Sequence, residues 1–378
     1  MIIKGIRLIN YRNYNSMSAS FGSGINILVG KNAQGKTNLL EAIYMCSTGR
    51  SFRTLRDKEL ISFGKNEAYV AAELNIGELE KFTEIKLEAD KSKRIRVNKV
   101  ELKSYKELNT GLKVVVFFPD DLKLVKEGPG NRRNYLDSSI SQLKPVYHHN
   151  LSRYYKALIQ KNNLLKSRRS TSELQELLEV FDVQLARLGT LISMEREQYI
   201  RRIKKEARDI HLQITSGKEE LDIKYNTNVP EGESLLDIER KYLEQLRRGR
   251  ARDIEIGSTS IGPHRDDFIP SINGNDLRTF GSQGQQRTLV LTLKLSEVKI
   301  LKKETGYYPV LLLDDVYSEL DEERREFLTS LFSETQTFIT VTDAIEADSL
   351  KNFDKTIYYV REGCLYNGNK TWREVNGE

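Results

Sequence analysis

Residues 30–37 read Gly-Lys-Asn-Ala-Gln-Gly-Lys-Thr, a spacing of glycines, lysine and hydroxyl that suits phosphate binding. Gly30 and Gly35 allow the backbone to curl until several N–H groups converge on phosphate oxygens. Lys36 is expected to reach the β- and γ-phosphates, and the Thr37 hydroxyl to meet Mg²⁺. The expected cofactors are therefore ATP and Mg²⁺. The expected nucleotide-binding residues form one continuous loop: Gly30, Lys31, Asn32, Ala33, Gln34, Gly35, Lys36, Thr37 and Asn38.

The elements on either side of this loop must position it. The apolar run at 25–29 predicts a buried strand, and residues 38–43 predict a helix. A strand that enters a glycine-bracketed loop, which then opens a helix, is the context that nucleotide binding requires. A glycine-rich turn of no function is the alternative, and the flanking elements favour the nucleotide site.

An acidic pair, Asp314 and Asp315, follows the apolar run at 310–313. A hydrophobic strand that delivers acids to the edge of a sheet is how phosphate-loop enzymes hold Mg²⁺ and orient water. We expect Asp314 to hold Mg²⁺ through water. Asp315 is expected to act as a base or to orient water beside the γ-phosphate. Together with Lys36, the two acids form the predicted catalytic set.

A third motif, Gly-Ser-Gln-Gly-Gln-Gln-Arg at 281–287, precedes a helical pattern. N–H groups and a hydroxyl at the start of a helix face outward along its axis and attract an anion. Ser282, Gly284 and Gln285 are therefore candidates for contact with a phosphate. The alternative is that this segment simply caps the helix.

The chain changes character twice along its length. The first hundred or so residues contain short runs in which polar and apolar residues alternate, and strand-like runs return after about residue 254. The segment between them is helical in pattern. The sequence predicts an α/β fold, a head with mixed sheets and an inserted α-helical lobe. The expected parts are residues 1–130 and 253–378, which form the head, and residues 131–252, which form the lobe.

Two apolar stripes predict helices in the lobe. Residues spaced alternately by four and three form a seam: Leu174, Leu178, Phe181, Leu185, Leu188 and Ile192. A shorter, earlier stripe consists of Leu151, Tyr155, Leu158 and Leu165. The seam covers fewer than three heptads, too few for a long coiled coil, so we expect a compact antiparallel bundle.

The positive charge of the chain is concentrated in the same lobe. The net charge is +6, and between Lys144 and Arg252 there are 22 Lys and Arg against 16 Asp and Glu, so the rest is neutral. A neutral body with a basic arm is typical of a protein that meets a polyanion, although a solvated helical face is the alternative. Sequence-independent contact with the phosphates of such a polyanion is expected from the two densest clusters. These are Arg201, Arg202, Lys204 and Lys205, and Arg247, Arg248, Arg250 and Arg252.

Composition excludes several classes of protein. No run of 18 apolar residues exists, and the N-terminus lacks the apolar stretch of a signal peptide, so no membrane partner is expected. The only cysteines are Cys46 and Cys364, which indicates a reducing, cytoplasmic location without disulfides. The four histidines and two cysteines have no metal-ligand spacing, so no zinc site is expected.

Together, the phosphate loop, the acidic strand and the turn at 281–287 resemble ATP-binding-cassette ATPases. In that family the turn is a signature that binds the γ-phosphate held by another subunit. The resemblance implies that Ser282, Gly284 and Gln285 act in trans, in an ATP-dependent homodimer. Residues 318–321, which end at Asp321, resemble the D-loop that crosses the dimer interface.

The chain also departs from the cassette pattern at two places. The family usually has a switch histidine after the strand that follows, where this chain reads Thr-Val-Thr-Asp at 340–343. It commonly has Glu at the position of Asp315. The missing histidine argues against the standard histidine-switched mechanism, and the shorter acid at position 315 implies slow ATP turnover.

About 245 residues separate the phosphate loop from the signature, a gap typical of chromosome-maintenance and repair ATPases and not of transporter ATPases. Several segments resemble the RecF family of bacterial recombination and replication-repair proteins. They are residues 10–14, 50–54, 118–122, 128–133, 262–267 and 284–288. The resemblance implies an ATP-dependent dimer with weak, DNA-stimulated ATPase activity. It also implies that this dimer binds double-stranded or gapped DNA and works with RecR and RecO to load RecA.

The resemblance also suggests roles for individual residues. Arg50 and Arg53 would contact the nucleotide, with a surface ion pair as the alternative. Asp120 or Asp121 would take the place of the glutamine loop, although an ordinary turn is an equal alternative. His264 and Arg265 would be functional, or would form ion pairs with the acids at 266 and 267.

The expected function is therefore that of an ATP-gated dimeric clamp on DNA. A transporter-energising ATPase is the main alternative, which predicts a membrane partner and no affinity for DNA. The long gap and the basic insertion disfavour it. An overcoming-lysogenization-type nuclease would need a further acidic domain, for which the chain has no room after residue 345.

Overall fold

The chain forms two compact units in the computed structural model. The structure describes residues 1–378 except 105–107, 109, 168–171, 318–319, 344–352 and 369–378. One unit joins Met1–Asp121 to Lys294–Glu378, and the other consists of Leu122–Leu293. The second unit thus begins before residue 131 and continues past residue 252, the limits expected for the lobe. No helix within the described ranges is long and apolar enough to cross a membrane.

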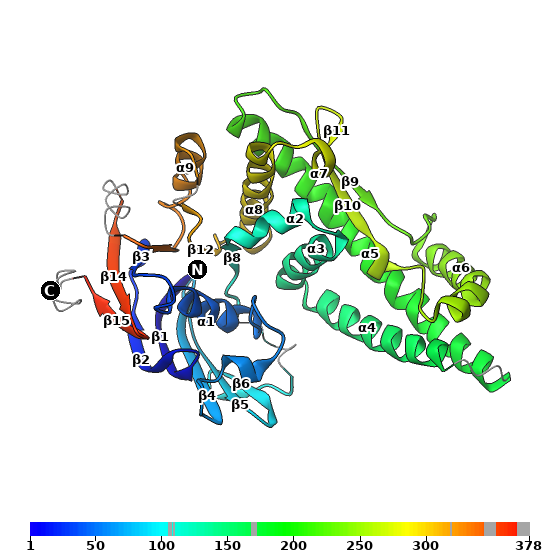
Figure 1. Ribbon diagram of the computed structural model, residues 1–378, viewed down its shortest axis with the longest axis horizontal. Helices are drawn as coiled ribbons and strands as arrows, with labels where there is room; N and C mark the ends of the chain where they lie inside the picture. The colour runs from blue at the N-terminus through cyan, green and yellow to red at the C-terminus, as the bar shows by residue number, and fades with distance from the viewer. Residues whose placement is uncertain (105–107, 109, 168–171, 318–319, 344–352, 369–378) are drawn as a thin grey trace. The chain divides into compact units, whose positions relative to one another are not determined.

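The first unit contains an antiparallel sheet of six strands in the order β2-β1-β4-β5-β6-β7 (Figure 1). Side chains alternate between buried and half-buried along the second half of β5, as the polar–apolar pattern predicts. The strands are β1 (Ile2–Tyr11), β2 (Tyr14–Ser20), β4 (Glu67–Ile76), β5 (Leu79–Glu88), β6 (Lys91–Val97) and β7 (Val100–Glu101).

The second sheet of this unit carries the nucleotide motifs and has the order β15-β14-β3-β13-β12-β8. All its neighbouring strands are parallel except β14 and β15. The strands β3, β8, β12 and β13 are buried at every position, which explains their continuous apolar runs. The strands are β3 (Ile25–Val29), β8 (Val114–Phe117), β12 (Val310–Leu313), β13 (Thr337–Val341), β14 (Lys355–Arg361) and β15 (Cys364–Asn367).

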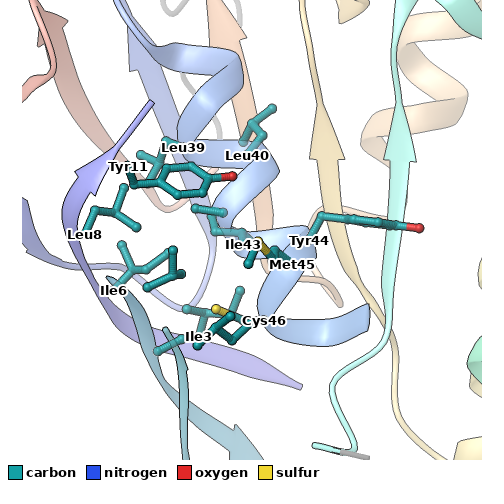
Figure 2. Packing of buried hydrophobic residues seen from close by; sticks show 14 of the residues in the cluster. Ile3, Ile6, Leu8, Tyr11, Leu39, Leu40, Ile43, Tyr44, Met45 and Cys46 are labelled. Carbon is teal, nitrogen blue, oxygen red and sulfur yellow. The ribbon is translucent and has the colours of Figure 1, made fainter. Parts of the chain in front are cut away.

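Helix α1 (Lys36–Thr48) supplies the apolar residues that join the two sheets into one core. Figure 2 shows its side chains facing those of β1. Cys46 is fully buried there, and burial raises the pKa of its thiol to about 12. The helix ends at Gly49, which adopts a left-handed conformation that glycine favours. Because α1 packs against both sheets, its first turn is held in one position at the end of β3.

The remaining elements of this unit are short. Those in the described residues are the 3₁₀ helices η1 (Asp57–Leu60) and η3 (Pro119–Leu122) and helix α9 (Glu322–Thr329). Leu122, the last residue of η3, already belongs to the second unit.

The second unit is built around one long helix, α5 (Ser172–Ile214), of 43 residues. It packs against α4 and α6, and further contacts join it to α3 and β9. The predicted seam is buried except for Phe181, which is half-buried, and the buried stripe continues to Ile214. In α4, Tyr154 is fully buried and Tyr155 only partly so. The other helices are α2 (Lys123–Lys126), α3 (Pro129–Leu143), α4 (Pro145–Lys166), α6 (Leu235–Ile256) and η4 (Pro263–Arg265).

A small antiparallel sheet in the order β11-β10-β9 completes the second unit and leads to the signature segment. The last helix, α8, begins in this unit and crosses the boundary at Leu293. The elements are β9 (Leu221–Asn226), β10 (Asp267–Ile272), β11 (Asn275–Asp276), α7 (Leu277–Phe280) and α8 (Gln283–Thr305).

Candidate nucleotide-binding site and signature segment

The phosphate loop leaves the buried strand β3 and turns into α1, as expected from its flanking residues. Gly35 has φ +120°, a conformation that other residues rarely adopt. A Cβ atom at Gly30 would lie 2.4 Å from the carbonyl oxygen of Val360 on β14. The two glycines are therefore required by backbone geometry, one for the turn and one for close packing against the neighbouring strand.

The backbone donors of the loop have no acceptor of their own. The N–H groups of residues 31–35 donate to no other group within the described part of the chain. The Lys36 ammonium donates to the carbonyl oxygens of Gly30 at 2.6 Å and Lys31 at 3.3 Å. A curled backbone with unused N–H groups and a lysine bonded across it fits the phosphate groups of a nucleotide.

Two side chains at the start of β2 hold the loop in this shape. Asn13 donates to the Gln34 carbonyl at 2.8 Å, and Tyr14 donates to the Gly35 carbonyl at 3.0 Å. Asn38 donates to Asn13 Oδ1 at 2.8 Å, which ties the first turn of α1 to the same support. On the other side, the Glu362 N–H donates to Gln34 Oε1 at 2.7 Å. The loop is thus held by residues from both sheets.

The acidic pair lies beside Thr37, as the motifs predict. The Thr37 hydroxyl is 2.9 Å from Asp314 Oδ1, at the end of β12. On β13, Thr340 Oγ1 lies 3.1 Å from Asp314 Oδ1 and 3.0 Å from Asp315 Oδ1. The same oxygen accepts the Asp315 N–H at 2.8 Å. One buried hydroxyl therefore connects both acids.

The backbone of Asp315 is strained, with φ +52°. For a residue with a Cβ this conformation costs on the order of 1 kcal/mol. The bond from its N–H to Thr340 helps to hold it. Strain of this kind is frequent at functional sites, where the surroundings fix a side chain in one direction.

Asp314 and Thr37 form a set of oxygen ligands that fits Mg²⁺. Burial raises the pKa of Asp314, with a further contribution from the charge of Asp315, whereas hydrogen bonds from Thr37 and Thr340 oppose this rise. A bound cation would favour the charged carboxylate. Among the described residues, no three His, Cys, Asp or Glu side chains gather as metal ligands. Mg²⁺ would therefore depend on nucleotide oxygens for most of its coordination.

The arginines expected near the nucleotide have different surroundings. Arg53 donates to Asn38 Oδ1 at 2.8 Å, and its guanidinium lies 4.0 Å from the buried carboxylate of Glu41. Glu41 also binds Arg12 at 2.8 Å and accepts from the Ser51 hydroxyl. Arg50 has no ion-pair partner in the described ranges of the chain. Arg53 is thus positioned at the first turn of α1, whereas Arg50 has a charge that no described acid pairs with.

Asp121 is buried and has partners within the first unit. Its carboxylate accepts the Phe118 N–H at 2.9 Å and lies 3.0 Å from the Lys294 ammonium. The side chain is 6% exposed, and burial raises its pKa although Lys294 opposes the shift. These contacts match the ordinary-turn interpretation.

The signature segment forms a reciprocal cap at the start of α8. The Ser282 N–H donates to Gln285 Oε1 at 2.9 Å, and the Gln285 N–H donates to Ser282 Oγ at 3.2 Å. This is a capping box, in which a serine and a residue three positions later satisfy each other's backbone donors. Ser282 itself is exposed. The cap and a phosphate contact are compatible, because the Ser282 oxygen acts as acceptor here and its hydroxyl hydrogen can donate elsewhere.

Only part of the expected D-loop can be described. Residues 318 and 319 lie outside the described residues. Asp321 is exposed and caps α9, where its carboxylate accepts the Arg324 N–H at 3.1 Å.

His264 and Arg265 form no ion pairs with Asp266 or Asp267. His264 bonds Tyr154 at 2.7 Å and the Thr259 carbonyl at 3.0 Å, and Arg265 donates to the same carbonyl. The acids pair instead with buried arginines: Asp266 lies 3.6 Å from Arg196, and Asp267 lies 2.6 Å from Arg132. These contacts favour the structural interpretation of the segment over a direct functional one.

The basic clusters divide into buried and exposed members. Arg250 is 16% exposed and bonds Asp182 at 2.7 Å and Glu179 at 2.8 Å. Arg247 also binds Glu179. Exposed pairs join Arg201 to Glu197, Lys204 to Asp222 and Arg248 to Glu244. Lys205 and Arg252 are exposed and have no ion-pair partner among the residues that the structure describes.

Sequence reasoning gave no role to Asn13, Tyr14, Glu41 or Thr340. The first two lie in the segment 10–14, which was noted only as a resemblance. Thr340 is the first residue of the segment 340–343, where the cassette family usually has its switch histidine. Their contacts with the loop and the acids depend on strand pairing, which short motifs do not report.

The two sheets, the phosphate loop and the capped signature segment define a P-loop ATPase head. A family model described as RecF/RecN/SMC N terminal domain matches residues 2–364. The chain also shares a fold with the Smc head domain of Pyrococcus furiosus, with a TM-score of 0.52 at 16% identity over 99% of this chain and 98% of that chain.

Closer relatives specify the family. The DNA replication and repair protein RecF of Clostridium novyi (strain NT) is 46% identical over 97% of this chain and 99% of the relative. RecF of Alkaliphilus oremlandii (strain OhILAs) is 43% identical over 97% and 100%. A solved structure of the recombination mediator protein RecF with ATP, in the RecFOR pathway, has a TM-score of 0.89 at 38% identity and covers 97% of each chain. The chain belongs to the RecF family of DNA replication and repair proteins.

Proposed function

We propose that this protein is an ATP-gated clamp, in which two copies close on double-stranded DNA near gaps. The observation that carries the proposal is the pair of half-sites. One unit has a phosphate loop whose N–H groups at 31–35 have no acceptor among the described residues, and the other has an exposed serine at a capped helix start. Nucleotide bound by the loop of one copy would be covered by Ser282 and Gly284 of a second copy. ATP then joins the two molecules.

Hydrolysis would reset this clamp. Lys36 and the loop N–H groups hold the phosphates, while Thr37 and Asp314 would hold Mg²⁺, which neutralises charge on the phosphate oxygens. Asp315, held by Thr340, orients the attacking water and accepts its proton. Asp is one methylene shorter than Glu, which is consistent with slow turnover.

The basic face of the second unit is the proposed contact with DNA. Lys205 and Arg252 carry it best, because both are exposed and unpaired within the described ranges. Arg201, Lys204 and Arg248 are held only in exposed pairs, which cost little to break. Arg250 remains in its ion pairs in this scheme, so its role is structural. RecR and RecO are the proposed partners, and loading of RecA is the proposed outcome.

The Lys36→Met variant tests ATP gating. The substitution removes the ammonium that faces the phosphates, so we expect nucleotide affinity to fall by tenfold or more and ATP-dependent dimerisation to be lost. Sedimentation with a non-hydrolysable ATP analogue, with and without gapped duplex, measures both dimer and DNA complex. Lys65→Met, at an exposed position of the same unit, is the matched control. A Lys36→Met protein that still dimerises with ATP would refute the gating.

A further inference from the structure

A hydrogen-bond network connects Ser282 of the signature segment to the long helix α5, entirely within the second unit. Gln285 Nε2 donates to Glu219 Oε1 at 2.9 Å, and Glu219 Oε2 lies 3.1 Å from His211 Nε2. His211 Nδ1 lies 3.1 Å from the Thr292 hydroxyl. His211 is fully buried and Glu219 is 21% exposed.

The chemistry of these groups fixes the direction of every bond. An ionised carboxylate only accepts, so both His211 Nε2 and the Gln285 amide nitrogen must donate to Glu219. His211 Nδ1 is then the acceptor from Thr292 in the neutral ring. Burial lowers the pKa of His211, which favours this neutral form.

The same logic fixes the signature segment. Because the Gln285 amide nitrogen points to Glu219, its oxygen faces the Ser282 N–H and accepts from it at 2.9 Å. In return, Ser282 Oγ accepts from the Gln285 N–H. The hydroxyl hydrogen of Ser282 is therefore directed away from Gln285. Ser282 is oriented as a donor, which is the role that an anionic phosphate requires.

We infer that Glu219 is a positioning residue for the signature serine. It holds the Gln285 amide in the one orientation that completes the cap of α8, and it anchors that amide to α5 through His211. The inference rests on the proposed function, in which Ser282 meets the γ-phosphate of another copy. Nothing in the sequence motif marks Glu219, which lies 66 positions from Gln285.

Replacing the carboxylate by an amide tests the direction of the bonds. In Glu219→Gln, while His211 carries its proton on Nε2, the introduced amide can offer its oxygen to His211 only by turning its NH₂ group toward the NH₂ group of Gln285. Two donors then face each other, and a flip of Gln285 would move the conflict to Ser282. We expect ATP-dependent dimerisation to weaken about tenfold or more. Nucleotide binding to the phosphate loop should be unchanged.

The reverse exchange supplies a rescue. Gln285→Glu alone places two carboxylates together and should weaken dimerisation in the same way. The double variant Glu219→Gln with Gln285→Glu restores every bond with donors and acceptors exchanged between the two positions. We expect it to recover dimerisation to within about threefold of the parent. Rescue by the pair is a result that a general loss of stability would not give.

Glu220→Gln is the matched control. Glu220 is adjacent in sequence and pairs with Arg208 of α5 at 2.9 Å, and among the described residues its side chain has no hydrogen bond or ion pair with the signature segment. It should dimerise as the parent does. Hydrogen exchange of the peptide 281–287, without nucleotide, reads the cap directly. Exchange should accelerate severalfold in each single variant and return to the parent rate in the double variant.

The readouts separate the two hypotheses. If the parent never dimerises with ATP, the proposed function fails, and the exchange measurement still decides the role of Glu219. If the parent dimerises and both single variants, Glu219→Gln and Gln285→Glu, do so equally well with unchanged exchange, the positioning role is refuted. A double variant as defective as the single ones would also overturn it.

Discussion

At the scale of single residues, Thr340 is the unexpected member of the site. Its hydroxyl is fully buried between Asp314 and Asp315 and accepts the N–H of Asp315. In the sequence, the end of β13 is notable because the switch histidine of the cassette family is missing there. In the structure, β13 contacts both acids through the Thr340 hydroxyl, one position before the strand ends.

Thr340→Val tests this contact, because valine keeps the shape and removes the hydroxyl. We expect ATP binding to be unchanged and kcat to fall about tenfold or more, since Asp315 loses the group that holds its backbone and carboxylate. Steady-state hydrolysis, with KM compared against kcat, measures the effect. Thr340→Ser keeps the hydroxyl and should retain most of the activity. Equal rates for the valine and serine variants would show that the hydroxyl has no part in turnover.

At the scale of elements, His264 joins η4 to α4. Its Nε2 donates to the Thr259 carbonyl, and in the neutral ring its Nδ1 accepts from the Tyr154 hydroxyl. Burial is the largest cause that lowers the pKa of His264, to about 4. In the unfolded chain the pKa of this imidazole is near 6.5, so between pH 6.5 and 4 the unfolded state binds a proton more readily than the folded state does.

Stability should therefore depend on pH in a defined window. Above about pH 6.5 this contribution is constant, and as pH falls toward about 4 the folded state loses up to about 3 kcal/mol. Urea unfolding at pH 8 and pH 5, for the parent and His264→Gln, measures it. The variant should show a smaller loss between the two pH values. An identical loss of unfolding free energy in both proteins would show that folding does not lower the pKa of His264.

The length of α5 shows what the sequence could and could not specify. The seam from Leu174 to Ile192 predicted a helix, but the helix continues to Ile214. The pattern is interrupted by Arg196, which reads as a surface residue in sequence. In the structure Arg196 is fully buried and pairs with Asp137 of α3 at 2.8 Å. A buried charge is tolerated only when it has a partner, and that partner lies 59 positions away.

The nucleotide motifs were predictable for the opposite reason. The phosphate loop and the acidic strand are each set by local backbone requirements, such as the positive φ of Gly35 and the buried strand β12. Their supports, such as Tyr14 and Thr340, depend on which strands are neighbours. Sheet order is a property of the whole fold, and no short pattern encodes it.

At the scale of the whole molecule, the charge distribution gives the prediction for DNA. Lys205→Glu and Arg252→Glu reverse two exposed charges that have no ion-pair partner among the described residues. We expect each change to weaken duplex binding severalfold and to reduce the salt slope by about 1 per lost phosphate contact. Binding titrations between low and physiological salt measure both quantities. Lys65→Glu, in the other unit, is the control for net charge. Unchanged slopes in both variants would remove these residues from the interface.

The strand order also has a consequence for synthesis. The Ile3 N–H donates to the side chain of Gln336, 333 positions away, and the neighbours of β3 on both sides are β13 and β14 from the end of the chain. By contrast, Leu122–Leu293 is contiguous. On the ribosome, the nascent chain can complete this middle portion while the ATP-binding sheet still waits for its last strands. We therefore expect the second unit to fold before the ATP-binding sheet of the first unit is complete.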